Sequence, residues 1–167
     1  MSTRNRSDLI ESIEHQARVG STQIVLFHTA IAERLGLNPS DHKVADILSL
    51  AEGPVTPGRL AELTGLTTGA ITGVLDRLES GGFVVREPDP TDRRRIIVRL
   101  LPGRIPELVG LFASIGARLR ELCSHYTTEE LSTVLEFMER NAALVKASAA
   151  ELREKPPPNS GKKKAGP

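Results

Sequence analysis

The side chains with the clearest chemical potential are three consecutive arginines, Arg93, Arg94 and Arg95, which follow a turn-rich stretch of proline, aspartate and threonine. Three further arginines lie close by in the sequence: Arg86, Arg99 and Arg104. Guanidinium groups bind phosphate oxygens through charge-assisted hydrogen bonds. A turn that carries several of them is therefore a candidate contact to a nucleic-acid backbone.

The basic character of the chain is local. Its 167 residues include 22 basic and 21 acidic side chains, which gives a net charge of +1. Four of the basic residues are lysines of the segment 155–167, so residues 1–154 hold 18 basic and 21 acidic side chains, a net −3. This balance excludes a uniformly basic surface. We expect the Pro-, Gly- and Lys-rich segment 155–167 to be a disordered tail that adds at most weak attraction to phosphates.

No pattern in the sequence indicates an enzyme. A glycine-rich phosphate loop with its lysine is absent, and so is the sharp turn that exposes a nucleophilic serine. With no tryptophan, one tyrosine and four phenylalanines, the chain also lacks the aromatic surface on which single-stranded nucleic acid stacks. We therefore expect a protein that catalyses no reaction and needs no cofactor.

Metal or thiol chemistry is an alternative with little support. Cys123, the single cysteine, lies on an apolar helical stripe, and we expect it to be a small buried side chain. Glu121 and His125 are four residues apart and would form half of a zinc site, which Asp41 and His42 would have to complete. Scattered histidines are more often helix-surface residues, so we expect no metal. A metal- or redox-responsive protein stays open as an alternative.

Both ends of the chain follow the period of an α-helix. Apolar residues over residues 7–35 predict one long helix, or two pieces hinged near Gly20, that ends at Gly36. Two more helices are predicted near the C-terminus. One carries an apolar stripe over residues 105–122, and the other begins at a Thr–Glu capping box at residues 127–130.

Three shorter helices in the middle have clear start signals. Asn38-Pro39 opens the first, Thr56-Pro57 the second, and Thr67 the third, which is predicted to end near Ser80. The last two match a helix-turn-helix. They supply the small residue, turn glycine and two buried residues that this motif needs: Ala61, Gly65, Ile71 and Val74. A helical hairpin without a role in DNA binding is the alternative.

The apolar period then changes from 3.6 to 2 residues. Residues 83–86 and 95–100 predict two strands, joined by a turn-rich tip at residues 87–92. A hairpin directly after a helix-turn-helix is the arrangement of a wing.

Residues 38–101 resemble the winged helix-turn-helix of the MarR (multiple antibiotic resistance regulator) family. The resemblance is carried by LAELTGLTTGAITGVLDRLESGGFVVREPDPTDRRRIIVRL at residues 60–100, and most of all by its wing tip. There Asp92 and Arg94 fit the family's Asp-x-Arg motif. One long helix before this region and two after it extend the likeness to residues 8–152. The implied fold is mainly α with a small β-hairpin wing.

The resemblance also implies a homodimer in which the terminal helices form the dimerisation region. We expect an N-terminal dimerisation helix at residues 1–37 and the winged helix-turn-helix at residues 38–103. C-terminal dimerisation helices would occupy residues 104–154, followed by the tail. The apolar stripes of the terminal helices are too broad to be left solvated, which favours the same arrangement. A monomeric six-helix bundle is the alternative.

The third short helix is expected to enter the major groove of double-stranded DNA. Burial of its apolar face would turn outward Asp76 and the candidate DNA contacts, with the capping threonine before them: Thr67, Thr68, Gly69, Thr72, Gly73 and Arg77. Small side chains let the backbone approach the base edges, and the free N–H groups of the first turn suit a phosphate. Arg77 is suited to a phosphate, unless it pairs with an acidic neighbour such as Asp76 or Glu79.

By resemblance, Asp92 orients Arg94, which would enter the minor groove, while Arg93 and Arg95 would contact the flanking phosphates. The minor groove is narrow and negative over A·T tracts, which favours an inserted arginine. A merely solvated turn is the alternative.

The family resemblance further implies a small organic effector. Its candidate contacts are aromatic and apolar residues of the long first helix and its neighbours, each of which could instead be an ordinary core residue: Phe27, His28, Ile31, Leu48 and Phe112. We interpret the chain as a dimeric, sequence-specific regulator, most often a repressor, that leaves an inverted-repeat operator when its effector binds. A winged domain that binds protein instead of DNA is the alternative from another class.

The sequence gives no sign of a membrane partner. No apolar run approaches the ~20 residues that cross a bilayer. The first residues, MSTRNRSDLI, lack the apolar region of a signal peptide. We therefore expect a cytoplasmic protein.

Overall fold

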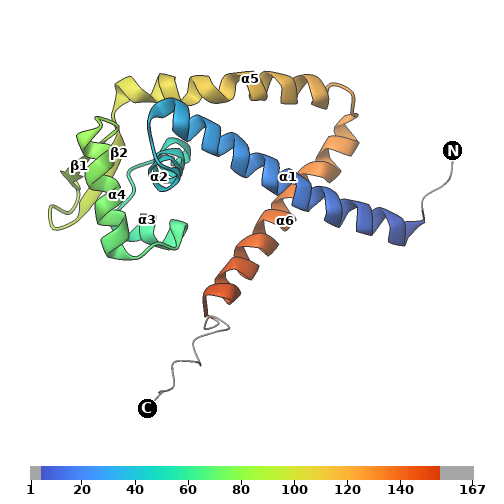
Figure 1. Ribbon diagram of the computed structural model, residues 1–167, viewed down its shortest axis with the longest axis horizontal. Coiled ribbons are helices and arrows are strands. Elements are labelled where there is room, and N and C mark those ends of the chain that lie inside the picture. The colour runs from blue at the N-terminus through green and yellow to red at the C-terminus, as the bar shows by residue number, and fades with distance from the viewer. Residues whose placement is uncertain (1–4, 155–167) are drawn as a thin grey trace, which may run out of the picture. The chain divides into compact units, whose positions relative to one another are not determined.

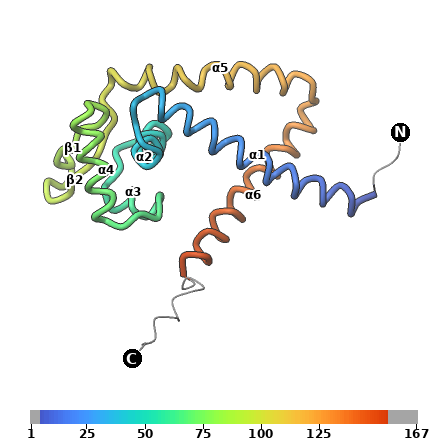
Figure 2. Tube along the Cα trace, viewed as in Figure 1, coloured from blue at the N-terminus to red at the C-terminus, as the bar shows by residue number. Residues whose placement is uncertain are grey.

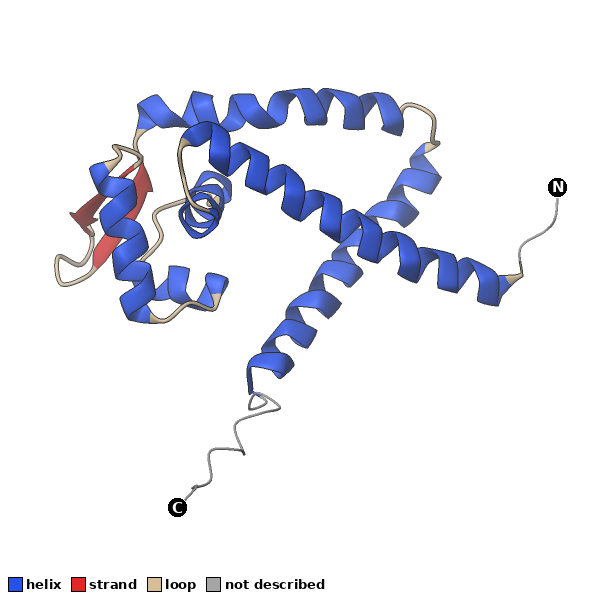
Figure 3. Ribbon diagram, in the orientation of Figure 1, coloured by secondary structure: helices blue, strands red, loops and turns tan. Residues whose placement is uncertain are grey.

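The computed structural model describes residues 5–154, so the predicted tail at residues 155–167 lies outside the described residues (Figure 1). The elements in chain order are α1 (Arg6–Leu35), α2 (Pro39–Leu50), α3 (Pro57–Thr64), α4 (Thr68–Ser80), β1 (Val84–Pro88), β2 (Ile96–Leu100), the short 3-10 helix η1 (Pro102–Arg104), α5 (Ile105–Cys123) and α6 (Thr128–Glu154). The predicted fold class, mainly α with one β-hairpin, is confirmed (Figure 3). The chain forms two compact units, one up to residue 114 and one from residue 115.

The helix starts lie where the capping residues predicted them. The side chains of Asn38, Thr56 and Thr67 each accept a hydrogen bond from the backbone N–H three residues further on, at 2.9, 3.2 and 3.2 Å. At the start of α6 the bonds are reciprocal, since Thr127 N–H donates to Glu130 and Glu130 N–H donates to the Thr127 hydroxyl. Each cap satisfies a backbone group that would otherwise lack a partner in the first helical turn.

Two glycines end helices in the left-handed conformation. Gly36 closes α1 at φ 67°, and Gly65 forms the turn between α3 and α4 at φ 72°. Glycine adopts these angles without the steric penalty of a Cβ. The alternative of a hinge near Gly20 is wrong, because α1 runs unbroken from Arg6 to Leu35.

The core of the first unit lies between α2, α3, α4 and the hairpin. The apolar face predicted for α4 is confirmed: Ile71, Val74, Leu75 and Leu78 are all at most 2% exposed. The other members of this cluster come from every neighbouring element: Val44, Ala45, Leu48, Val55, Leu60, Phe83, Val84, Val98, Leu100 and Leu108. Burying a side chain of this size contributes roughly 1.5–3 kcal/mol. The core therefore fixes which face of α4 points outward.

The hairpin reaches further toward its tip than the sequence predicted. β1 and β2 pair antiparallel from Val84 opposite Leu100 to Pro88 opposite Ile96, so Glu87 and Pro88 belong to a strand and not to the turn. A cross-strand ion pair between Arg99 and Glu87, at 2.6 Å, favours this extension. Figure 2 follows the chain from α4 into the hairpin and on to α5.

The terminal helices expose many large apolar side chains. On α6 no described residue is buried. The exposed apolar residues include Leu9, Ile10, Ile13 and Val19 on α1, Ile115, Leu119 and Leu122 on α5, and Val134, Leu135, Phe137, Met138, Leu144 and Val145 on α6. Among residues 5–154, no helix has the length and apolar character needed to cross a membrane.

Candidate nucleic-acid interface

The first half of α4 presents a smooth outer face. Thr68, Gly69 and Thr72 are exposed, and a Cβ built on Gly69 would have no heavy atom within 4 Å. The Thr72 hydroxyl donates to the Thr68 carbonyl at 3.0 Å, so its oxygen keeps its capacity to accept. Thr67 accepts from the Ala70 N–H and so fixes the start of the helix. The other N–H groups of the first turn suit an anion. The backbone here is open to a large partner.

Arg77, at the other end of this face, is held by a residue that the sequence analysis did not connect with it. Its Nε donates to Asp41 Oδ2 at 2.9 Å and its Nη2 donates to Asp41 Oδ1 at 2.7 Å. The hydrogen bonds with Asp41 raise the pKa of Arg77 above its usual value. The acidic neighbours named as possible partners, Asp76 and Glu79, pair with Arg86 of β1 instead.

The remaining arginines near the wing differ in whether they have partners within the protein. Arg86 and Arg99 form ion pairs with acidic residues of the same unit. Arg104 lies 4.4 Å above the Phe83 ring and donates to the Gly81 and Gly82 carbonyls. Arg93, Arg94 and Arg95 are exposed, and within the described part of the chain none of them has a carboxylate at ion-pair distance. Among the arginines near the wing, these three have guanidinium groups that are fully available to an external phosphate.

Hydrogen bonds within the wing tip hold these arginines on an ordered turn. Asp89 accepts from both the N–H and the hydroxyl of Thr91, at 2.8 and 2.6 Å, and these bonds lower the pKa of Asp89. Asp92 Oδ1 accepts from the backbone N–H of Arg94 at 3.1 Å. Arg95 N–H donates to the Asp92 carbonyl at 2.9 Å. Asp92 thus acts on the backbone of Arg94 and leaves its guanidinium free.

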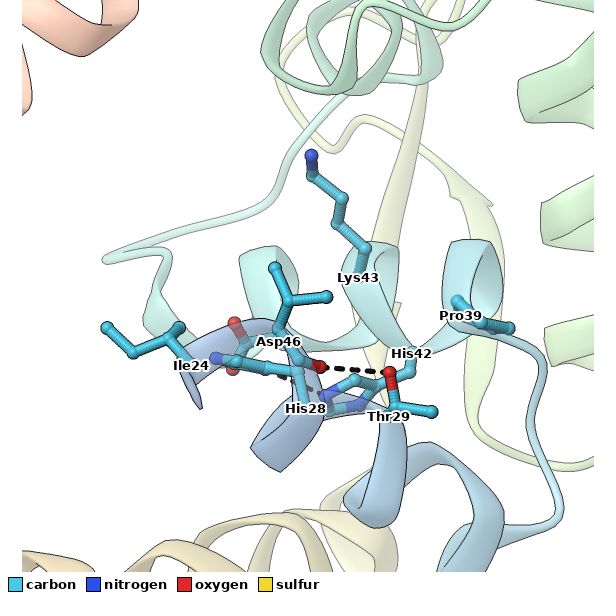
Figure 4. Close-up of a pocket in the computed structure, with 8 residues that line it drawn as sticks. Ile24, His28, Thr29, Pro39, His42, Lys43 and Asp46 are labelled. Carbon is cyan, nitrogen blue, oxygen red and sulfur yellow. Dashed lines mark hydrogen bonds between the residues drawn. The ribbon is translucent and has the colours of Figure 1, made fainter. Parts of the chain in front are cut away.

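The residues predicted to hold a small ligand do not line one cavity. Phe27, His28 and Phe112 form a cluster of rings, with centroids 5.6–6.0 Å apart. Ile31 and Leu48 are buried, at 4% and 8% exposed. A cleft of about 290 Å³ lies instead between α1 and α2 (Figure 4). It is lined by Ile24, Val25, His28, Thr29, Pro39, His42, Lys43 and Asp46, so His28 is the one predicted residue that reaches it.

A pair of histidines stands in this cleft. His28 Nδ1 lies 3.0 Å from His42 Nε2, and His42 is 2% exposed. The expectation that the histidines lie on helix surfaces is therefore wrong for His42. Its Nδ1 is buried and has no hydrogen-bond partner among residues 5–154. Burial lowers the pKa of His42; the Asp46 carboxylate opposes this shift, and His28 adds to it.

Sequence reasoning named Asp41 and His42 only as possible members of a zinc site and missed that both are buried in α2. Asp41 shares the i, i+3, i+7 stripe of Val44 and Leu48, and His42 lies three residues before the buried Ala45. That spacing was the available signal. Among residues 5–154, no group of three or more His, Cys, Asp or Glu side chains could hold a metal ion, and Cys123 is only half-buried in the single chain.

Comparison with known proteins gives consistent matches. The model of the MarR family matches residues 35–95. YcgE, an HTH-type transcriptional regulator of Bacillus subtilis, is 42% identical over 155 residues, which span 92% of this chain and all of YcgE. The multiple antibiotic resistance protein MarR of Escherichia coli is 34% identical over 85 residues, 50% of this chain and 58% of that protein.

Solved structures match at the level of the fold. The transcriptional regulator Tm0710 of Thermotoga maritima aligns with a TM-score of 0.57 at 21% identity, over 84% of this chain and 98% of that one. Wild-type MarR of Escherichia coli, in its apo form, aligns with a TM-score of 0.52 at 24% identity, over 83% and 98%.

The buried histidine predicts a pH-dependent stability. The folded pKa of His42 lies below the value of 6.5 that applies when the chain is unfolded. Below about pH 6.5 the unfolded chain binds a proton that the folded chain resists, so the free energy of unfolding falls as the pH is lowered and is fully retained above that range. We expect the urea midpoint to decrease between about pH 7.5 and 5.5, as followed by circular dichroism.

The substitution His42→Gln should reduce this dependence, whereas His15→Gln, at an exposed position of α1, should leave it unchanged. An equal loss of stability on acidification in the wild-type chain and in His42→Gln would contradict the assignment.

Proposed function

This chain belongs to the MarR family of DNA-binding transcription regulators, and we propose that it is a repressor that binds a specific inverted-repeat sequence as a homodimer and leaves it when a small organic effector binds. The observation that carries the proposal is the open face of α4, together with three exposed wing-tip arginines that form no ion pair within residues 5–154. We further propose that it acts in the cytoplasm, because a relative that is 42% identical is a bacterial transcription regulator.

The two parts of the interface suit different features of a duplex. The major groove admits an α-helix, and the threonines and glycines of α4 would lie against its base edges: Thr67, Thr68, Gly69, Thr72 and Gly73. Threonine offers a hydroxyl to bases or phosphates and a methyl group to thymine. Arg94 would enter the minor groove, where a narrow A·T tract concentrates negative potential. Arg93 and Arg95 would contact phosphates on either side, and Arg77 would contact a phosphate beside the major groove.

The exposed apolar residues of the terminal helices support the dimer. Large apolar surface is rarely left in water, and here it extends over α1, the end of α5 and α6. Pairing two identical chains covers such surface and also presents two identical α4 helices. The recognised DNA would then be an inverted repeat with half-sites about one helical turn apart.

The cleft between α1 and α2 is the place where we propose that an effector binds. It combines apolar walls from Ile24 and Val25 with the polar groups of His28, Lys43 and Asp46. A ligand that favours a different spacing of the two α4 helices would shift the population of dimers away from the DNA-binding form.

The wing provides the sharpest test of DNA binding. The probe is the duplex that the wild-type chain selects from a random-sequence library. Arg94→Ala should weaken binding by about 1–3 kcal/mol without changing the melting temperature, because the arginine is exposed. Asp92→Ala should also weaken binding, because it removes the bond that shapes the backbone at Arg94. Fluorescence anisotropy measures both.

Simple charge repulsion predicts the opposite sign for Asp92→Ala, a gain in affinity from losing an acid near phosphates. A gain would show that the wing is only a diffuse positive patch. Arg140→Ala removes the same positive charge as Arg94→Ala, but from α6, and serves as the matched control for that variant. A winged domain that binds protein would show no duplex binding whose affinity falls with salt.

Light scattering tests the dimer. The wild-type chain should have twice the mass of one 18.1 kDa chain at micromolar concentration. Leu144→Glu places a charge on an exposed apolar position of α6 and should shift the protein toward monomer, whereas Lys146→Glu on the same helix should not. A duplex with a single half-site should bind far more weakly than the full repeat. A monomeric wild-type chain, or equal affinity for half and full sites, would refute the dimer.

Release by an effector is tested by filling the cleft. A library of small organic compounds is screened for release of the labelled duplex from the wild-type chain. Compounds that release it should fail on Ile24→Trp, in which the indole occupies the cleft, and should still act on Glu14→Trp, at an exposed position of the same helix. Compounds that act equally on Ile24→Trp would place the effector elsewhere.

A further inference from the structure

Asp41 has an unusual position for a carboxylate in this chain. It lies in the first turn of α2, and its side chain is 4% exposed. Three hydrogen bonds reach its two oxygens. They come from Arg77 Nε at 2.9 Å, Arg77 Nη2 at 2.7 Å and Asn38 Nδ2 at 2.9 Å. Its own N–H donates to Asn38 Oδ1 at 2.9 Å. The carboxylate is thus fixed from both sides, by the cap of α2 and by a residue of α4.

The arginine in this pair is in the opposite situation. The side chain of Arg77 is 52% exposed on the outer face of α4. Its Nε and Nη2 face Asp41, while its Nη1 hydrogen-bonds with none of the described residues. Nη1 lies 3.6 Å from the point where a Cβ on Gly73 would stand. The Nη1 edge of this half-exposed side chain therefore lies beside Gly73, where no side chain stands between the two.

Such a clamp changes what an arginine contributes to binding. A free arginine loses the freedom of several rotatable bonds when it binds a phosphate. A guanidinium already held by a bidentate carboxylate has lost that freedom on folding, so less is lost when a ligand arrives. The pairing leaves the Nη1 edge to donate, since a guanidinium carries five N–H groups.

We propose that Asp41 is a positioning residue for DNA binding: it holds the Arg77 guanidinium so that the free Nη1 edge donates to a DNA phosphate, without touching DNA itself. This inference rests on the proposed binding of DNA through α4. It gives α2 a role in DNA binding, although the sequence pattern of α4 and the wing gives no indication of that role.

Two physical effects of removing the Asp41 charge have opposite signs. If Asp41 acted only through its charge, Asp41→Asn would strengthen binding to a polyanion. If it positions Arg77, the same change weakens binding, because an amide offers one acceptor oxygen in place of two and no charge to hold the guanidinium. The sign of the effect therefore separates a positioning residue from a bystander.

The experiment is a double-mutant cycle on Asp41→Asn and Arg77→Ala, measured by anisotropy with the duplex that the wild-type chain selects from a random library. Each single substitution should weaken binding about tenfold, and the double variant should bind no more weakly than Arg77→Ala alone. In both single variants the slope of log affinity against log salt concentration should decrease by about the amount that one phosphate contact contributes. The same loss should appear on an unrelated duplex, because phosphates carry no sequence.

Matched variants keep the outcome interpretable. Asp76→Asn removes an equal charge from α4. Asp76 pairs with Arg86 and not with Arg77, so the affinity for DNA should be unchanged or higher. Arg77→Lys keeps the charge but cannot make the bidentate contact, so it should weaken binding even if Asp41→Asn fails to fold.

Three results would overturn the proposal. One is a folded Asp41→Asn that binds as tightly as the wild type, even if it melts at a lower temperature. Another is a double variant whose losses multiply. The third is wild-type affinity in Arg77→Lys. If the wild-type chain bound no duplex, the proposed function itself would fail; if Arg94→Ala weakened binding and Asp41→Asn did not, only the role of Asp41 would be wrong.

Discussion

The burial of one face of α4 is the constraint on which the rest of this structure depends. Ile71, Leu75 and Leu78 are sealed into a core built from α2, α3 and the hairpin, and burying each contributes roughly 1.5–3 kcal/mol. This burial fixes the orientation of α4 about its own axis. Its opposite face, with Thr68 and Thr72, must then point outward. The face of α4 that we propose for DNA binding is thus a consequence of the packing on its other side.

The charges around this helix are arranged by pairing. A chain with nearly equal numbers of acidic and basic residues can still present a local positive surface where neighbouring cations are not paired with carboxylates. Arg86 pairs β1 with α4, Arg99 pairs with Glu87 across the hairpin, and Arg104 donates to the backbone just before β1. Within the described part of the chain the three arginines of the wing tip form no ion pair, and the aspartates of the turn bond to backbone and hydroxyl groups instead.

The first turn of α2 contacts both the cleft between α1 and α2 and the arginine on the outer face of α4. His42 faces the cleft beside His28, and Asp41, the residue directly before it, holds Arg77 of α4. The same turn of helix thus borders the proposed effector site and the proposed DNA interface. Both residues are buried, so both depend on the packing of α2 against its neighbours.

The sequence by itself determined the helices, the hairpin and which face of α4 points outward, because caps, turn glycines and apolar period act over a few residues. The caps at Asn38 and Thr67 and the inner face of α4 needed no other information. Contacts between distant residues were decided only by the tertiary structure. Arg77 meets Asp41 across 36 positions, and His28 meets His42 across 14. No local pattern encodes such a meeting, since it exists only after α1 and α4 have packed against α2.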